Sequence, residues 1–118
     1  MASTSLNDIY ETGTGENIIS VKVTVPGNQR SVSTVKLNAK VILENFVNTF
    51  SIDLGKAKDI TGSKLFIETT EADIDPDTNT VSFELEIQGG SKVFSDKRTQ
   101  TVSTGGNIYY TAEIVLIP

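Results

Sequence analysis

The 118-residue sequence contains no cysteine and no histidine. Without cysteine, the chain can form neither a disulfide nor a thiolate metal site. Without histidine, it can hold no Ser-His-Asp triad, no Cys-His pair and no histidine-based zinc or iron site. The Gly13-Thr14-Gly15 stretch precedes a strand pattern rather than a helix, so it does not match a phosphate-binding loop. We therefore predict no catalytic residues and a protein that is not an enzyme.

Long apolar runs and an excess of positive charge are also missing. No run approaches the roughly 18 apolar residues of a membrane span, and the first residues lack the basic and apolar regions of a secretory signal peptide. Ten basic and fifteen acidic residues give a net charge of −5, and such a chain repels nucleic-acid phosphates unless its basic residues cluster. We expect a soluble protein that binds no nucleic acid and inserts into no membrane. A virion and the cytoplasm are both compatible locations.

The sequence does contain a globular composition and repeated strand patterns. Hydrophobic residues make up 37% and charged residues 21% of one domain-sized chain. Apolar and polar residues alternate over residues 19–25, 65–70, 81–87 and 108–117, which predicts half-buried strands. With about seven to eight strands separated by short turns, we predict an all-β fold: an antiparallel β-sandwich, jelly-roll or Ig-like, or a small barrel. The predicted core comprises Val21, Val23, Leu37, Val41, Leu65, Ile67, Phe83, Leu85, Ile87, Ile114 and Leu116.

Residues 32–54 fit two interpretations. Their alternation favours two strands, about 32–44 and 46–54, whereas a few apolar residues also share one helical face. We prefer the strands because Val, Ile, Thr, Asn and Phe are middling or poor helix formers. The alternation slips at Glu44-Asn45, which indicates a bulge or a bend there. Residues 55–62 are expected to form a loop or a single helical turn.

The two ends of the chain carry the predicted interface. Residues 1–16 are polar and read as a flexible N-terminal arm before a single β domain over 17–118. The arm is either a mobile tail or a segment that lies on a neighbouring subunit. The last strand is apolar on both faces, so it is either central or an edge covered by a partner. The predicted interface residues are Leu6, Ile9, Tyr10, Val115 and Ile117.

Residues 65–70 and 81–87 flank an Asp75-Pro76-Asp77 sequence with good turn chemistry, so we predict a β-hairpin. Aligning the inward faces pairs Leu65 with Ile87 and sets Glu68 opposite Glu84. Like charges directly across a ladder are unfavourable. We therefore expect a lysine, a cation or water to relieve this pair.

The same segment contains no basic residue and seven of the fifteen acids: Glu68, Glu71, Asp73, Asp75, Asp77, Glu84 and Glu86. The spacing of Asp73, Asp75 and Asp77, with Glu84 eleven residues after the first, resembles that of calcium ligands in an EF-hand loop. The match is partial, because Thr78 stands where that loop has glycine and the flanks have strand patterns. Three interpretations stay open: a solvated turn, a calcium site made of these four residues, or a contact with a basic partner. Calcium is the sole cofactor considered.

Our leading hypothesis is a non-enzymatic structural or assembly protein, such as a virion, filament or surface component. It would act through self-association, as a homo-oligomer or within a larger protein assembly. The first alternative is a ligand-binding β module, calcium-dependent, that uses the acidic hairpin 68–86. The second is an acidic adaptor or inhibitor of a basic protein partner. Tyr109 is the best outward aromatic for a carbohydrate platform, but a lone outward tyrosine favours cross-strand packing.

Overall fold

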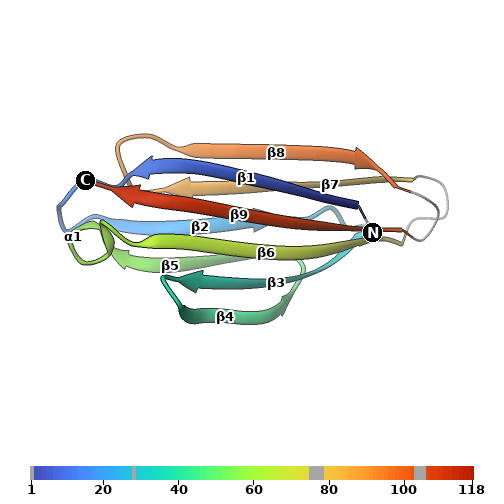
Figure 1. Cartoon of the computed structure of the whole chain (residues 1–118), viewed down its shortest axis with the longest axis horizontal. Helices are drawn as coiled ribbons and strands as arrows, with labels where there is room; N and C mark the ends of the chain where they lie inside the picture. The colour runs from blue at the N-terminus through green and yellow to red at the C-terminus, as the bar shows by residue number, and fades with distance from the viewer. Residues whose placement is uncertain (1, 28, 75–78, 103–105) are drawn as a thin grey trace.

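The computed structural model describes residues 2–27, 29–74, 79–102 and 106–118, with only the backbone for Ala2 and Asp73 (Figure 1). This part of the chain is nearly all β, which confirms the predicted class, and its one short helix lies where a single helical turn was expected. The elements are β1 (Ala2–Glu11), β2 (Ile18–Thr24), β3 (Gln29–Leu37), β4 (Lys40–Val47), β5 (Phe50–Lys56), α1 (Ala57–Ile60), β6 (Lys64–Asp73), β7 (Thr80–Gln88), β8 (Phe94–Thr101) and β9 (Asn107–Ile117).

The strands form two sheets. Sheet A has the order β1-β9-β6-β3-β4, and sheet B has the order β5-β2-β7-β8. Neighbouring strands are antiparallel, except that β1 runs parallel to β9. The strands follow the long axis of the molecule, and β1 lies beside β9 (Figure 1).

The predicted hairpin between residues 65–70 and 81–87 is wrong. β6 pairs with β3 and β9 in sheet A, whereas β7 pairs with β2 and β8 in sheet B. Glu68 therefore lies between Thr34 and Thr111, and Glu84 lies across from Lys97 in the other sheet. The alternation correctly gave the buried face of each strand, but it carries no information about the pairing partner. Six residues separate the strands, too many for a tight turn to fix their pairing.

Residues 32–54 contain parts of three strands rather than two, and no helix. The turns fall at Asn38 and Asn48, whose φ angles are +55° and +66°. Asparagine tolerates this left-handed region better than most residues. The bulge predicted at Glu44-Asn45 is confirmed, because β4 has an extra residue there relative to β3 and Asn45 has a φ of +52°.

The structure differs from the predicted arm at the N-terminus. β1 pairs with β9 in continuous register from Ala2–Ile108 to Glu11–Ile117. Thr12 extends this contact, since its N–H donates to the Ile117 carbonyl at 2.8 Å. The sequence pattern missed β1 because most of its residues are polar. Its partner strand also lies about a hundred residues away.

The two sheets share one hydrophobic core. Nine of the eleven predicted core residues are buried: Val21, Val23, Leu65, Ile67, Phe83, Leu85, Ile87, Ile114 and Leu116. The rings of Phe83 in sheet B and Tyr110 in sheet A meet edge to face, with centroids 4.0 Å apart. Leu37 is half-buried, and the prediction for Val41 is wrong. The β4 bulges shift Val41 to the outside, opposite Lys36.

Candidate interaction surface

Each sheet has an inner face toward the core and an outer face, and the two outer faces differ in chemistry. The outer face of sheet B is polar, and Ile18 at the start of β2 is the one large apolar side chain among its described strand residues. Its other outward side chains include Ser20, Lys22, Thr24, Ser82, Glu84, Glu86, Gln88, Ser95, Lys97, Thr99 and Thr101. This face has the composition of an ordinary solvated surface.

The outer face of sheet A carries large apolar side chains at two opposite corners, and also Val41 on β4 beside Lys36. At one corner, Ile9 on β1 lies next to Val115 on β9, with Ile117 one row further along β9. Ile9 is 58% exposed and Val115 is 38% exposed. At the other corner, Val32 on β3 is paired with Val47 on β4, at 41% and 52% exposure. At each corner the exposed apolar side chains adjoin one another, and contiguous apolar groups mark contact sites more often than single ones do.

Four charged side chains surround Phe66 at the centre of the same face. Lys64 and Glu68 precede and follow it by two residues along β6, while Glu113 on β9 and Lys36 on β3 are its cross-strand neighbours. Lys64 Nζ lies 2.7 Å from Glu113 Oε1, and Lys36 Nζ lies 6.0 Å from the centre of the Phe66 ring. Opposite charges therefore face each other across the Phe66 ring, Lys64 and Glu68 along β6 and Lys36 and Glu113 across the strands.

Tyr109, the outward aromatic noted in the sequence, contacts this centre. Its hydroxyl donates to Glu68 Oε2 at 2.7 Å, and this bond raises the pKa of Tyr109. The ring thus belongs to a cross-strand contact.

The structure separates the five predicted interface residues into two groups. Ile9, Val115 and Ile117 come together on the outer face of sheet A. Tyr10 is buried, and Leu6 packs against the core from β1. The alternation along β1 explains the split, because neighbouring side chains on a strand point to opposite faces.

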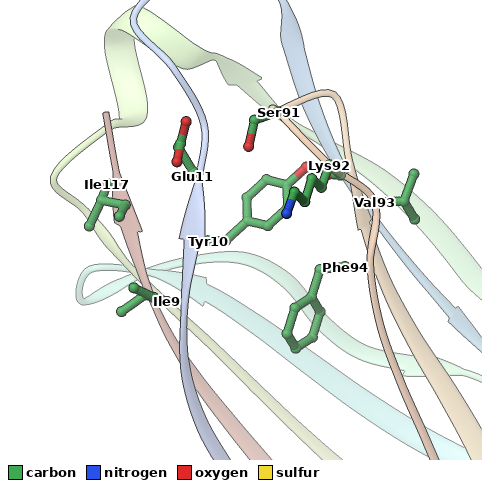
Figure 2. A pocket seen from close by; sticks show the side chains of 8 residues that line it. All are labelled: Ile9, Tyr10, Glu11, Ser91, Lys92, Val93, Phe94 and Ile117. Atoms are coloured by element: carbon green, nitrogen blue, oxygen red, sulfur yellow. Dashed lines mark hydrogen bonds between the residues drawn. The ribbon is translucent and has the colours of Figure 1, made fainter.

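A pocket of about 270 Å³ lies beside this corner, where β1 meets the segment between β7 and β8. Tyr10 points from β1 toward that segment, and Ile9, Glu11 and Ile117 lie on the other side of the β1 ribbon (Figure 2). The Tyr10 hydroxyl donates to the Lys92 carbonyl at 2.5 Å and accepts from the Gly90 N–H at 2.9 Å. The pocket is lined by Ile9, Tyr10, Glu11, Ser91, Lys92, Val93, Phe94 and Ile117.

Arg98 joins β8 to β1 further along the same side of the molecule. Its guanidinium donates to Thr4 Oγ1 at 2.6 Å and to both carboxylate oxygens of Asp96 at 3.0 and 3.2 Å. Asp96 also accepts from the Tyr110 hydroxyl at 2.9 Å. Burial raises the pKa of Tyr110, and this hydrogen bond raises it further. These contacts connect the edges of the two sheets.

The predicted calcium site is not assembled by the described residues. Asp75 and Asp77 lie outside them, as does the side chain of Asp73. Glu84 points outward from β7, between Thr24 on β2 and Lys97 on β8. Within the described part of the chain, no three acidic side chains come close enough to hold a metal ion. The calcium site stays a prediction.

Sequence reasoning missed a buried polar cluster on the inner face of sheet A. Glu71 is 2% exposed, and neither of its carboxylate oxygens has a hydrogen-bond partner among the residues that the structure describes. Ser31 on β3 is paired with Glu71, and its Oγ is also buried without a hydrogen-bond partner among the described residues. Burial raises the pKa of Glu71 to about 8. Glu71 lies an even number of residues from the inward Leu65 and Ile67, so it falls on the same face of β6. This spacing could have distinguished Glu71 from the solvated acids.

No family model, no curated protein and no solved structure matches the chain. Among the described residues, no helix is long and apolar enough to cross a membrane. The chemistry of the two outer faces is therefore the basis for a functional proposal.

Proposed function

We propose that this protein is a non-enzymatic structural or assembly component that acts by self-association through the outer face of sheet A. The observation that carries the proposal is the contrast between the two outer faces. Large apolar side chains at two corners of sheet A are exposed, whereas sheet B presents hydroxyls and charges. Water solvates exposed apolar surface unfavourably, so such patches commonly mark protein contacts.

The proposal includes a β-sandwich in which sheets A and B pack face to face. The contact between Phe83 and Tyr110 supports it, and so does the bond from Tyr110 to Asp96 on β8. The connectivity of a jelly-roll or an Ig-like sandwich belongs to the same proposal. In such a sandwich the inner faces form the core and the outer faces remain available to a partner.

The edges of both sheets favour association through a face rather than by strand addition. β4 has two bulges, β5 has one at Leu54, and β8 turns Asp96 and Arg98 inward. On β1, the Ile9 N–H donates to its neighbour Asp8, and the Glu11 carbonyl accepts from Ser91. Bulges, inward charges and occupied main-chain groups all hinder edge-to-edge pairing.

The test is the mass of the protein in solution, measured by light scattering or sedimentation over a range of concentrations. We expect a defined oligomer that Ile9→Asp weakens, because the change places a charge in an apolar contact. Ile18→Asp is the matched control, since it changes an exposed isoleucine on the outer face of sheet B. A parent protein that stays monomeric at every concentration would overturn the proposal. Equal effects of the two variants would exclude the outer face of sheet A as the contact.

A further inference from the structure

We infer that the partner is a second copy of this chain, packed with the outer face of its sheet A against the outer face of this sheet A. The two copies are related by a two-fold axis that lies between the faces. The axis runs diagonally across the sheet, from the Ile9–Val115 corner to the Val32–Val47 corner, so that the strands of the copies cross. The inference rests on the proposed function and specifies its partner and geometry.

The charges around Phe66 select this diagonal. A two-fold axis between two stacked faces fixes which residues meet. Each residue faces the residue of the other copy that lies at the same distance on the opposite side of the axis. On the chosen diagonal, Lys64 faces Glu113 of the other copy, and Lys36 faces Glu68 of the other copy. All four charges in each copy then meet the opposite sign, and Phe66 meets Phe66.

The other simple axes bring like charges together. The opposite diagonal sets Lys64 against Lys36. An axis along β6 sets Lys64 against itself, and an axis across the strands sets Lys36 against itself. Like-charge contacts across an interface are strongly unfavourable. A face that matches itself in one orientation has the property that an isologous two-fold contact requires.

The apolar corners fit the same axis. Because both corners lie on the diagonal, each meets the same corner of the second copy, so Ile9 and Val115 pack on their own counterparts. Val32 and Val47 do the same at the far end. The exposed apolar groups of the two corners are therefore covered by apolar groups of the other copy, whereas Val41 on β4 lies off the diagonal.

The net charge and the size of the face also suit a second copy. The outward positions of β1, β9, β6 and β3 carry three acids and three bases, although the whole chain has a net charge of −5.

Five strands about 4.8 Å apart span roughly 24 Å. Two such faces crossed near a right angle overlap over about 600 Å² each, at the lower end of stable interfaces. Orthogonal crossing is one of the two ordinary ways in which sheets pack.

The experiment is a charge-swap complementation measured by sedimentation and native mass spectrometry. Glu68→Lys alone and Lys36→Glu alone should each raise the dissociation constant by about a hundredfold, because each creates two like-charge contacts in the dimer. An equimolar mixture of the two variants should form a heterodimer, since every contact is again between opposite signs. Glu84→Lys and Lys97→Glu, a cross-strand pair on the outer face of sheet B, are the matched controls and should dimerise like the parent.

Two further controls keep the outcome clear. Tyr109→Phe removes the bond to Glu68 without changing charge, so it reports the effect of losing that bond. If Glu68→Lys does not fold, Lys64→Glu mixed with Glu113→Lys tests the same axis through the other charge pair.

The outcomes separate the two levels of inference. A monomeric parent contradicts both the assembly function and the crossed dimer. A parent that associates while the swaps have no effect, or while the mixture fails to recover the dimer, overturns the crossed two-fold arrangement and leaves assembly standing. Recovery of the heterodimer only in the mixture supports the second copy as the partner.

Discussion

Replacing Glu71 with glutamine should flatten the dependence of stability on pH. The Glu71 carboxyl is buried without a partner, and this burial raises its pKa from 4.5 to about 8. Between these two values the folded protein retains a proton that the unfolded chain has lost. The free energy of unfolding therefore falls as the pH rises from about 4.5 to about 8, and this contribution is constant outside that window.

The size of the effect follows from the same two pKa values. At about 1.4 kcal/mol per pH unit, the full loss above pH 8 is about 5 kcal/mol, of which about 3 kcal/mol is already lost at pH 7. Between pH 5 and pH 8 the parent should lose about 3.5 kcal/mol through this group. Glutamine has nearly the same shape and does not titrate, so Glu71→Gln should lack this loss. The total is a large fraction of the stability of a small domain.

The assay is urea unfolding of the parent and Glu71→Gln at pH 5, 6, 7 and 8. The difference between their unfolding free energies should widen with pH in favour of the variant. Glu16→Gln is the control: side-chain bonds from Lys56 and Lys58 lower the pKa of Glu16, so its contribution is lost only as the pH falls below about 4.5. It should keep the slope of the parent between pH 5 and 8. Parallel profiles for the parent and Glu71→Gln would refute the burial of this carboxyl between the sheets.

Three further changes test other parts of the structure. Phe83→Ala should lower the unfolding free energy by about 2–5 kcal/mol in urea titrations, because it leaves a cavity beside Tyr110; a change near zero would contradict the shared core. Gly90→Ala should lower the melting temperature more than Gly27→Ala, because a Cβ at residue 90 would lie 2.2 Å from the Glu11 carbonyl oxygen, whereas residue 27 has open space. If the predicted calcium ligands bind the ion, calcium should raise the melting temperature and chelator should reverse the rise, with about 2.7 kcal/mol gained at one hundred times the dissociation constant. No shift at millimolar calcium would leave the solvated-turn interpretation.

The strands with a clear alternation, such as β2, β7 and β9, could be predicted from sequence because each buries one side. In β9, Ile108 to Leu116 at every second position are buried as expected. The partners of the strands could not be predicted in this way, because β6 and β7 have the same alternation and would fit either sheet. The predicted site was limited for the same reason. Ile9 and Val115 of the predicted interface lie side by side in the structure, but the charges around Phe66 come from three strands that only the pairing brings together.

The start of β3 connects the buried polar cluster with the outer face of sheet A. Here the usual polarity of a half-buried strand is inverted: Ser31 and Ser33 point into the core, and Val32 between them points outward. Shifting the strand by one residue would bury Val32 and expose both serines, but it would also turn Val35 and Leu37 of the same strand out of the core. An isolated domain with this sequence therefore retains a local conflict between pattern and burial. A second copy that covers Val32 would remove this apolar side chain from water. The sequence of β3 is therefore itself a reason to expect that the outer face of sheet A is occupied.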